Sequence, residues 1–154
     1  MNALVDVPAN KGQSYPADTL TASEVGALRA ACSRRASTGI RNRALIVLLW
    51  RSGLRCAEAL DLRVRDVDRQ ASVVKVMRGK GGKTRTVPID AGAVEVLEEW
   101  LAERKRVRVP GGSTLFCTLQ GGRLDTSYVR RMLPRLAKRA GIERRVHAHM
   151  LRHT

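Results

Sequence analysis

Apolar residues recur every three to four positions along much of this chain, the spacing that places side chains on one face of a helix. This spacing predicts helices over residues 20–35, 40–52, 55–62, 91–106 and 126–140. Within the range 40–52, every position from 44 to 50 is apolar, which predicts a helix buried on most sides. Gly53 follows and is expected to end that helix in the left-handed conformation. A further helix begins near Ala148.

Local signals also mark where the folded region begins. Thr21 and Glu24 form a T-x-x-E capping box, which predicts the first turn of a helix. The residues before it are small and polar, so we expect residues 1–19 to be a flexible lead-in. Residues 20–154 are then long enough to form one domain with a sizeable core.

Two stretches rich in β-branched residues interrupt the helical spacing, at residues 72–77 and 85–89. A glycine-rich segment separates them, so the pattern predicts a β-hairpin. Residues 115–117 are a candidate third strand. Pro134 lies inside the helix predicted over 126–140 and is expected to kink it or delay its start. The predicted fold class is α+β, mainly helical with a small antiparallel β-sheet.

The charge of the chain favours an anionic partner. It carries 29 Lys and Arg against 14 Asp and Glu, a net charge of +15, while hydrophobic residues make up 44% and predict a folded protein. A field of this sign attracts polyanions such as nucleic acids in a salt-dependent way. A basic surface that serves only solubility has the same composition, so charge alone leaves both interpretations open.

The cysteines and the apolar runs indicate the compartment. Cys32, Cys56 and Cys117 are far apart and odd in number, which argues against a disulfide framework and against a C-x-x-C metal site. The N-terminus shows no basic-then-apolar signal pattern. The longest apolar run is far too short to cross a bilayer. We therefore expect a cytoplasmic protein without a membrane partner.

The first candidate site is the segment around Arg55. Gly53 allows a sharp turn, so that Arg55 projects from the beginning of a helix where backbone amides also favour phosphate. Glu58 lies one turn further and is placed to orient an arginine. The alternative is an exposed arginine beside an ordinary surface ion pair.

The second candidate is the tip of the predicted hairpin, where glycines leave room for a lysine to move. Lys80 and Lys83 both lie there, and the segment lacks the G-x-x-x-x-G-K-[ST] pattern of nucleotide-binding loops. The alternative is a solvated turn.

The third candidate pairs His149 with Arg152, three positions apart on one helical face. His147 is expected in a loop and His153 is expected to face away from that pair.

In this order, the three segments resemble the signatures of the tyrosine recombinases, the phage integrase family. The matching strings are G-L-R-x-x-E around Arg55, G-K-G-x-K-x-R-x-V-P around the hairpin tip, and H-x-L-R-H-T at the end. The resemblance covers residues 20–154 and implies a partial catalytic domain for DNA integration or site-specific recombination. The order of the segments argues against an unrelated basic DNA-binding protein.

The resemblance also implies a role for each residue. Arg55 and Arg152 would clamp the scissile phosphate of double-stranded DNA, and His149 would hydrogen-bond it and assist proton transfer. Lys80 would donate a proton to the departing 5′ oxygen. The reaction of the family requires neither metal nor nucleotide, so we expect no cofactor.

In the family, the chain continues beyond the third signature to a nucleophilic tyrosine, whereas this sequence ends at Thr154. Tyr15 and Tyr128 precede that signature, and Tyr128 is expected to pack in the core. We therefore expect a C-terminally incomplete domain that does not recombine DNA alone. The alternative is a regulator that binds DNA or a full-length recombinase without catalysis.

Incomplete coverage of the core is expected to leave apolar surface exposed, near residues 45–50 or 132–136. Such a patch favours self-association, so we expect a dimer or a concentration-dependent oligomer.

Overall fold

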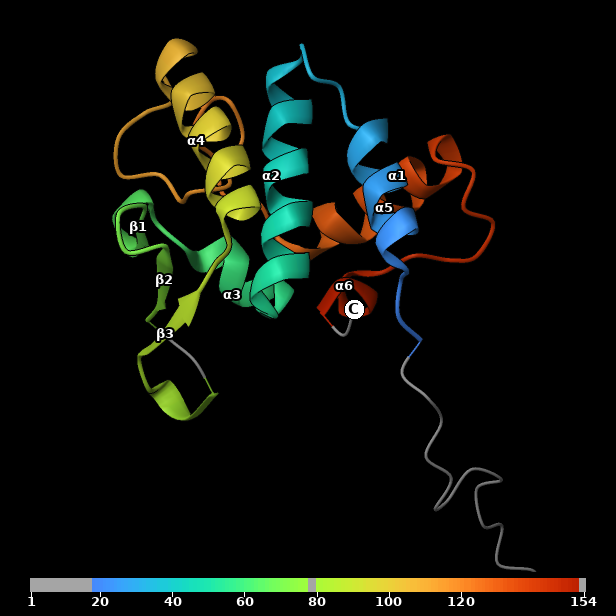
Figure 1. Cartoon of the computed structure of the whole chain (residues 1–154). Helices are drawn as coiled ribbons and strands as arrows, with labels where there is room; N and C mark the ends of the chain where they lie inside the picture. Colours follow the sequence, from blue (N-terminus) through green and yellow to red (C-terminus); the bar gives the residue numbers. More distant parts are fainter. Residues whose placement is uncertain (1–17, 78–79, 153–154) are drawn as a thin grey trace, which may run out of the picture.

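The computed structural model describes residues 18–77 and 80–152, and it shows a mainly helical α+β fold with a small antiparallel sheet, as predicted (Figure 1). The α-helices are α1 (Ala22–Ala31), α2 (Ser37–Ser52), α3 (Cys56–Asp61), α4 (Ala91–Arg106), α5 (Thr126–Arg139) and α6 (Ala148–Arg152). The strands are β1 (Val67–Asp68), β2 (Val73–Val76) and β3 (Arg85–Pro88), and the short 3-10 turns are η1 (Val64–Asp66) and η2 (Lys80–Gly82).

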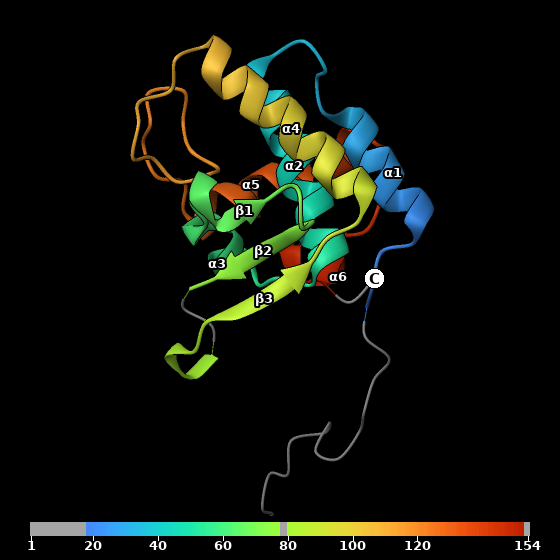
Figure 2. The same cartoon turned by 60° about the vertical axis from the view of Figure 1, so that its left-hand side comes forward.

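Helix α2 is the centre of the fold. It packs against α1, α3, α4 and α6, and both Figure 1 and Figure 2 show it surrounded by these helices. Residues 44–49 are each at most 2% exposed, which confirms the prediction of a helix buried on most sides. Burying each of these larger apolar side chains stabilises the fold by roughly 1.5–3 kcal/mol.

The predicted helix signals are confirmed at two ends. The Thr21 hydroxyl accepts a hydrogen bond from the Glu24 N–H (3.1 Å), and the Glu24 carboxylate accepts one from the Thr21 N–H (2.8 Å). Gly53 ends α2 with φ 67°, the left-handed conformation that glycine adopts most easily.

Helix α2 starts earlier than the predicted range of 40–52, because residues 37–39 already form its first turn. A Cβ atom on Gly39 would lie 2.2 Å from the Ser33 carbonyl oxygen, so only glycine allows this close approach. The Ser33 hydroxyl accepts hydrogen bonds from the N–H groups of Arg35 and Ala36 in the loop between α1 and α2. This contact joins the loop after α1 to the first turn of α2, and the spacing of apolar residues does not indicate it.

The sheet confirms the hairpin but not the third strand. Strands β2 and β3 pair antiparallel, with Val74 opposite Val87, and β1 pairs with the other edge of β2. Residues 115–117 are buried, yet this segment makes only an isolated bridge at Cys117, and the Leu115 N–H donates to the Leu62 carbonyl (2.7 Å). The prediction of a strand at 115–117 was wrong because these pairings last one residue each and lie outside the sheet.

Pro134 lies inside α5 without delaying its start, so that part of the prediction was wrong. The carboxylate of Asp125 accepts a hydrogen bond from the Tyr128 N–H (3.0 Å) and begins the helix at Thr126. The buried face of α5, which includes Met132 and Leu133, packs against α1 and holds the helix through the proline.

The apolar surface expected near residues 45–50 and 132–136 is absent from the described part of the chain. Leu48, Met132 and Leu136 are buried, and only Val64 and Met77 are exposed among the large apolar side chains described. Helix α6 packs on α2 and α5 and covers this region. The reason given for self-association was therefore wrong. None of the described helices is both long and apolar enough to span a membrane.

Candidate active site

Arg55 occupies the position that the first signature predicts. It is the N-cap residue of α3, is exposed, and follows the left-handed Gly53 and the buried Leu54. The Ser52 hydroxyl donates to the Leu48 carbonyl (2.6 Å) and accepts from the Leu54 N–H (3.3 Å), so the turn is held from within α2. The prediction that glycine produces a sharp turn before Arg55 is confirmed.

Glu58 orients an arginine, but the arginine is Arg85 of β3. Arg85 donates from Nη1 to Oε1 and from Nη2 to Oε2 of Glu58, both at 2.9 Å, in a bidentate ion pair. The second of these oxygens also accepts from the Arg55 N–H (2.9 Å). Glu58 therefore connects the hairpin to the turn that presents Arg55.

The charge of Glu58 is stabilised by these contacts. The hydrogen bond from Arg85 is the main cause that holds the pKa of Glu58 below its ordinary value, and the Arg55 N–H adds to it. The same contact raises the pKa of Arg85. Arg85 belongs to the second signature, but the sequence pattern did not indicate that Arg85 pairs with Glu58.

The hairpin tip contains both lysines that the sequence singled out. Lys80 begins η2, and its side chain lies outside the described part of the structure. Lys83 is exposed on the same tip. Gly81 and Gly82 have φ values of 82° and 71°, which explains why the tip is rich in glycine.

Arg152 reaches the same region from the far end of the chain. Its Nε donates to the Gly53 carbonyl oxygen at 2.9 Å, and its side chain is half-buried. His149 is exposed on α6, and its ring stacks against that of His147 with centroids 6.4 Å apart. His147 lies in a loop, as predicted, and the prediction for His153 lies outside the described residues.

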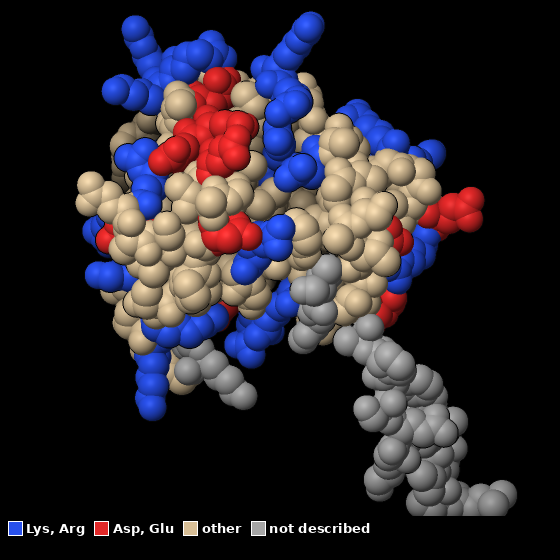
Figure 3. All heavy atoms as spheres, viewed as in Figure 1, with Lys and Arg blue, Asp and Glu red and all other residues tan. Residues whose placement is uncertain are grey.

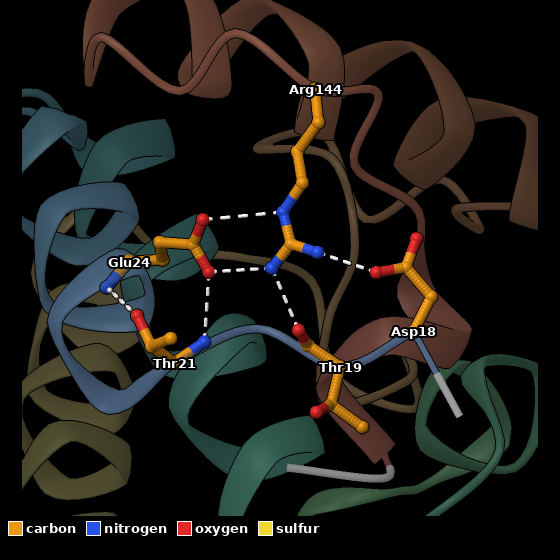
Figure 4. A network of polar contacts seen from close by, with 5 residues as sticks. All are labelled: Asp18, Thr19, Thr21, Glu24 and Arg144. Atoms are coloured by element: carbon orange, nitrogen blue, oxygen red, sulfur yellow. Dashed lines mark hydrogen bonds and ion pairs between the residues drawn. The ribbon is translucent and has the colours of Figure 1, made fainter. Parts of the chain in front are cut away.

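A polar network holds the segment that leads to α6 (Figure 4). Arg144 donates from Nη2 and Nε to Glu24 (2.6 and 3.2 Å), from Nη2 to the Thr19 carbonyl (2.7 Å), and pairs with Asp18. Hydrogen bonds from Arg144 lower the pKa of Glu24, and the Thr21 N–H adds to this effect. No local pattern indicated Arg144, because its partners lie more than a hundred positions earlier.

The surface around the site is basic. Figure 3 shows Lys and Arg side chains at the lower edge, beside the hairpin, with few acidic ones there, whereas acidic side chains gather over α4. Within residues 18–77 and 80–152, no group of three His, Cys, Asp or Glu side chains is placed to hold a metal ion.

The three signatures therefore meet at one end of α2. The turn at residues 53–58, the hairpin and α6 lie around the lower end of α2 in Figure 1, and Figure 2 shows the same grouping. The contacts of Arg85 with Glu58 and of Arg152 with Gly53 join them. An exposed guanidinium, a second guanidinium and an imidazole in one region are suited to binding a phosphate.

Residues 18–154 match the family described as the Phage integrase family. This chain belongs to the phage integrase family. Tyrosine recombinase XerC from Actinobacillus pleuropneumoniae serotype 7 is 32% identical over 154 residues, which cover 100% of this chain and 49% of XerC. The chain thus spans about half the length of the curated relatives it matches.

Solved structures agree with this assignment to the phage integrase family. The crystal structure of XerA recombinase matches 95% of this chain and 52% of XerA, with a TM-score of 0.77 and 34% identity. The structure of XerH site-specific recombinase bound to difH substrate, a pre-cleavage complex, matches 89% of this chain and 41% of XerH, with a TM-score of 0.71 and 32% identity. The fold predicted from the resemblance is confirmed.

Proposed function

We propose that this chain is part of the catalytic domain of a site-specific tyrosine recombinase and that it binds double-stranded DNA through the end of α2 where the three signatures meet. The observation that carries this proposal is the hydrogen bond from Arg152 to Gly53, which brings the third signature to the first. The relatives support it, because XerC is a tyrosine recombinase and the XerH structure is bound to its difH substrate.

In the proposed mechanism, the basic residues of the three signatures stabilise charge and supply a proton. Arg55 and Arg152 stabilise negative charge on the scissile phosphate, and His149 donates a hydrogen bond to one of its oxygens. A tyrosine oxygen attacks phosphorus, the bond to the 5′ oxygen breaks, and Lys80 supplies the proton to that oxygen. The resulting 3′-phosphotyrosyl link is resealed by a new 5′ hydroxyl.

Neither tyrosine of this chain fits the nucleophile in this proposal. Tyr15 and Tyr128 do not fall in a matching motif, and the Tyr128 hydroxyl is hydrogen-bonded to Arg41 and Asn42. Tyr128 also packs against the core, as predicted. We expect the 154-residue chain on its own to bind DNA without forming a covalent adduct.

The cytoplasm is the compartment that we propose, because all three cysteines are free thiols. Burial raises the pKa of Cys32 and of Cys56 to about 11, so both remain protonated near neutral pH.

Binding to a fluorescently labelled DNA duplex tests this proposal. Fluorescence anisotropy measures the affinity at several salt concentrations. Arg55→Ala is expected to weaken binding about fivefold and to lower the slope of log K against log salt by about 1, because one phosphate contact is lost. Arg29→Ala, which removes an exposed arginine from α1, is the matched control. Equal binding by both variants and the unaltered chain would rule out DNA contact through Arg55.

A further inference from the structure

A pocket of about 610 Å³ lies at the beginning of α2, away from the candidate active site. It is bounded by the end of α1, the start of α2, the loop at 118–124 and one face of α5. A helix of 16 residues spans about 24 Å, so the length of α2 separates this pocket from the Gly53 turn. Figure 1 shows α2 beginning at the end opposite α3 and α6.

The pocket contains a buried arginine with neutral partners. Arg41 is 3% exposed, and its guanidinium donates to the Cys117 carbonyl (3.0 Å), to Asn42 Oδ1 (3.0 and 3.1 Å) and to the Tyr128 hydroxyl. Its central carbon also lies 5.0 Å from the centre of the Tyr128 ring. Among the described ion pairs, none joins Arg41 to a carboxylate. A buried charge without an opposite charge is costly, so the arrangement favours an anion nearby.

Other parts of the lining add positive charge. Arg135 and Arg139 project from the exposed side of α5 at the pocket, and the described lining contains neither Asp nor Glu. The first turn of α2 opens here, and its N-cap residue Ala36 supplies no side-chain hydrogen bond. The backbone N–H groups of this turn and the positive end of the helix dipole also favour an anion.

The lining also includes a group of apolar side chains. These side chains, from the loop and from α5, are Leu119, Leu124, Met132 and Leu136. Pockets for small molecules have volumes of roughly 300–1,000 Å³, with apolar walls and a few converging polar groups, and this pocket has those properties.

We propose that this pocket binds a small organic anion, with its phosphate or carboxylate group among Arg41, Arg135 and Arg139 and its apolar part on the leucine and methionine side chains. The ligand would tie α1, α2 and α5 together at the end of the domain remote from the candidate active site. This binding is independent of the proposed DNA contact through Arg55.

Phenyl phosphate is a suitable probe because it combines an anionic group with an apolar ring. We expect it to shift the backbone amide signals of Thr38 and Thr118 in a saturable way when added to the ¹⁵N-labelled full chain. Inorganic phosphate tests the anionic group alone, and phenol tests the ring alone. Each is expected to bind at least about tenfold more weakly than phenyl phosphate, because each contacts only the charged or only the apolar side chains of the pocket.

Two double variants of α5 separate a specific site from general attraction. Arg135→Ala with Arg139→Ala removes two charges from the pocket, whereas Arg131→Ala with Lys138→Ala removes two charges from the same helix outside this pocket. All four side chains are exposed, so both variants should fold. The first is expected to weaken phenyl phosphate binding at least about tenfold and the second less than about twofold.

Three outcomes would overturn the proposal. In the first, phenyl phosphate leaves the Thr38 and Thr118 signals in place. In the second, the two double variants lose affinity for phenyl phosphate equally. In the third, a short DNA duplex shifts these signals while phenyl phosphate does not. The last outcome would assign the pocket to the DNA backbone.

Discussion

The Nε atom of Arg152 donates a hydrogen bond of 2.9 Å to the carbonyl oxygen of Gly53, which lies 99 positions earlier in the chain. Gly53 is the left-handed residue that ends α2, so Arg152 supplies a donor and a positive charge at the C-terminus of that helix. The same carbonyl lies two residues before Arg55. A residue that we propose for phosphate binding therefore also stabilises the turn that presents its partner.

Replacing Arg152 should thus lower stability as well as DNA binding. Arg152→Ala is expected to reduce the free energy of unfolding by about 1–2 kcal/mol, because a charged hydrogen bond at a helix end is lost from a half-buried position. Urea denaturation measures this. Arg145→Ala, an exposed arginine in the segment before α6, should change stability by less than about 0.5 kcal/mol. Equal stability of the two variants would argue against a stabilising role for the bond to Gly53.

Gly53 and Gly26 provide a pair in which the same change should have opposite effects. A Cβ atom at either position meets nothing within 4 Å, so packing does not decide the outcome. Gly53→Ala is expected to destabilise by about 1–2 kcal/mol, because φ is 67° there. Gly26→Ala lies inside α1 and should stabilise by roughly 0.5–1 kcal/mol. Shifts of the two denaturation midpoints in the same direction would contradict this explanation.

The ion pair of Glu58 with Arg85 predicts a dependence of stability on pH. The pKa of Glu58 is lowered in the folded state, mainly by Arg85, so its contribution is fully present above the ordinary value of 4.5. That contribution is lost as the pH falls below 4.5 and through the lower folded pKa. The difference in stability between the unaltered chain and Glu58→Gln should therefore shrink between pH 7 and about pH 3.

Urea denaturation at both pH values checks this prediction. Glu98→Gln on the exposed side of α4 is the control and should show no such change. A double-mutant cycle with Arg85→Met should give a coupling of about 1 kcal/mol or less, because Arg85 is 41% exposed. The prediction is contradicted if the difference in free energy of unfolding between Glu58→Gln and the unaltered chain stays constant with pH.

Arg144 is expected to order the segment that leads to His149. Arg144→Met removes its bonds to Glu24 and to the Thr19 carbonyl, so local opening near α6 should become more frequent. Hydrogen exchange of the Met150 amide, which donates to the His147 carbonyl, should accelerate about tenfold. Arg145→Ala changes the adjacent exposed arginine and should leave this exchange rate unaltered. Unchanged exchange in Arg144→Met would show that the Arg144 contacts do not hold α6 in place.

Local signals in the sequence determined much of the fold. The capping box of Thr21 and Glu24, the C-cap at Gly53 and the hairpin around residues 78–83 each depend on residues a few positions apart, and the structure contains the cap and both strands. The three signatures likewise indicated the family, because each is a short string whose residues act together.

Tertiary structure alone decided which distant residues meet. Residues 115–117 pair with loops outside the sheet, and Arg85 rather than Arg55 donates its guanidinium hydrogen bonds to the Glu58 carboxylate. Arg41 is buried with Tyr128, although its sequence neighbourhood resembles any basic helix start. Periodicity shows which face of an element is apolar, but the partners of a polar side chain depend on how separate elements pack. For that reason the sequence indicated Arg55 and Arg152 individually, and only the packing of α6 against α2 brought them to one end of the molecule.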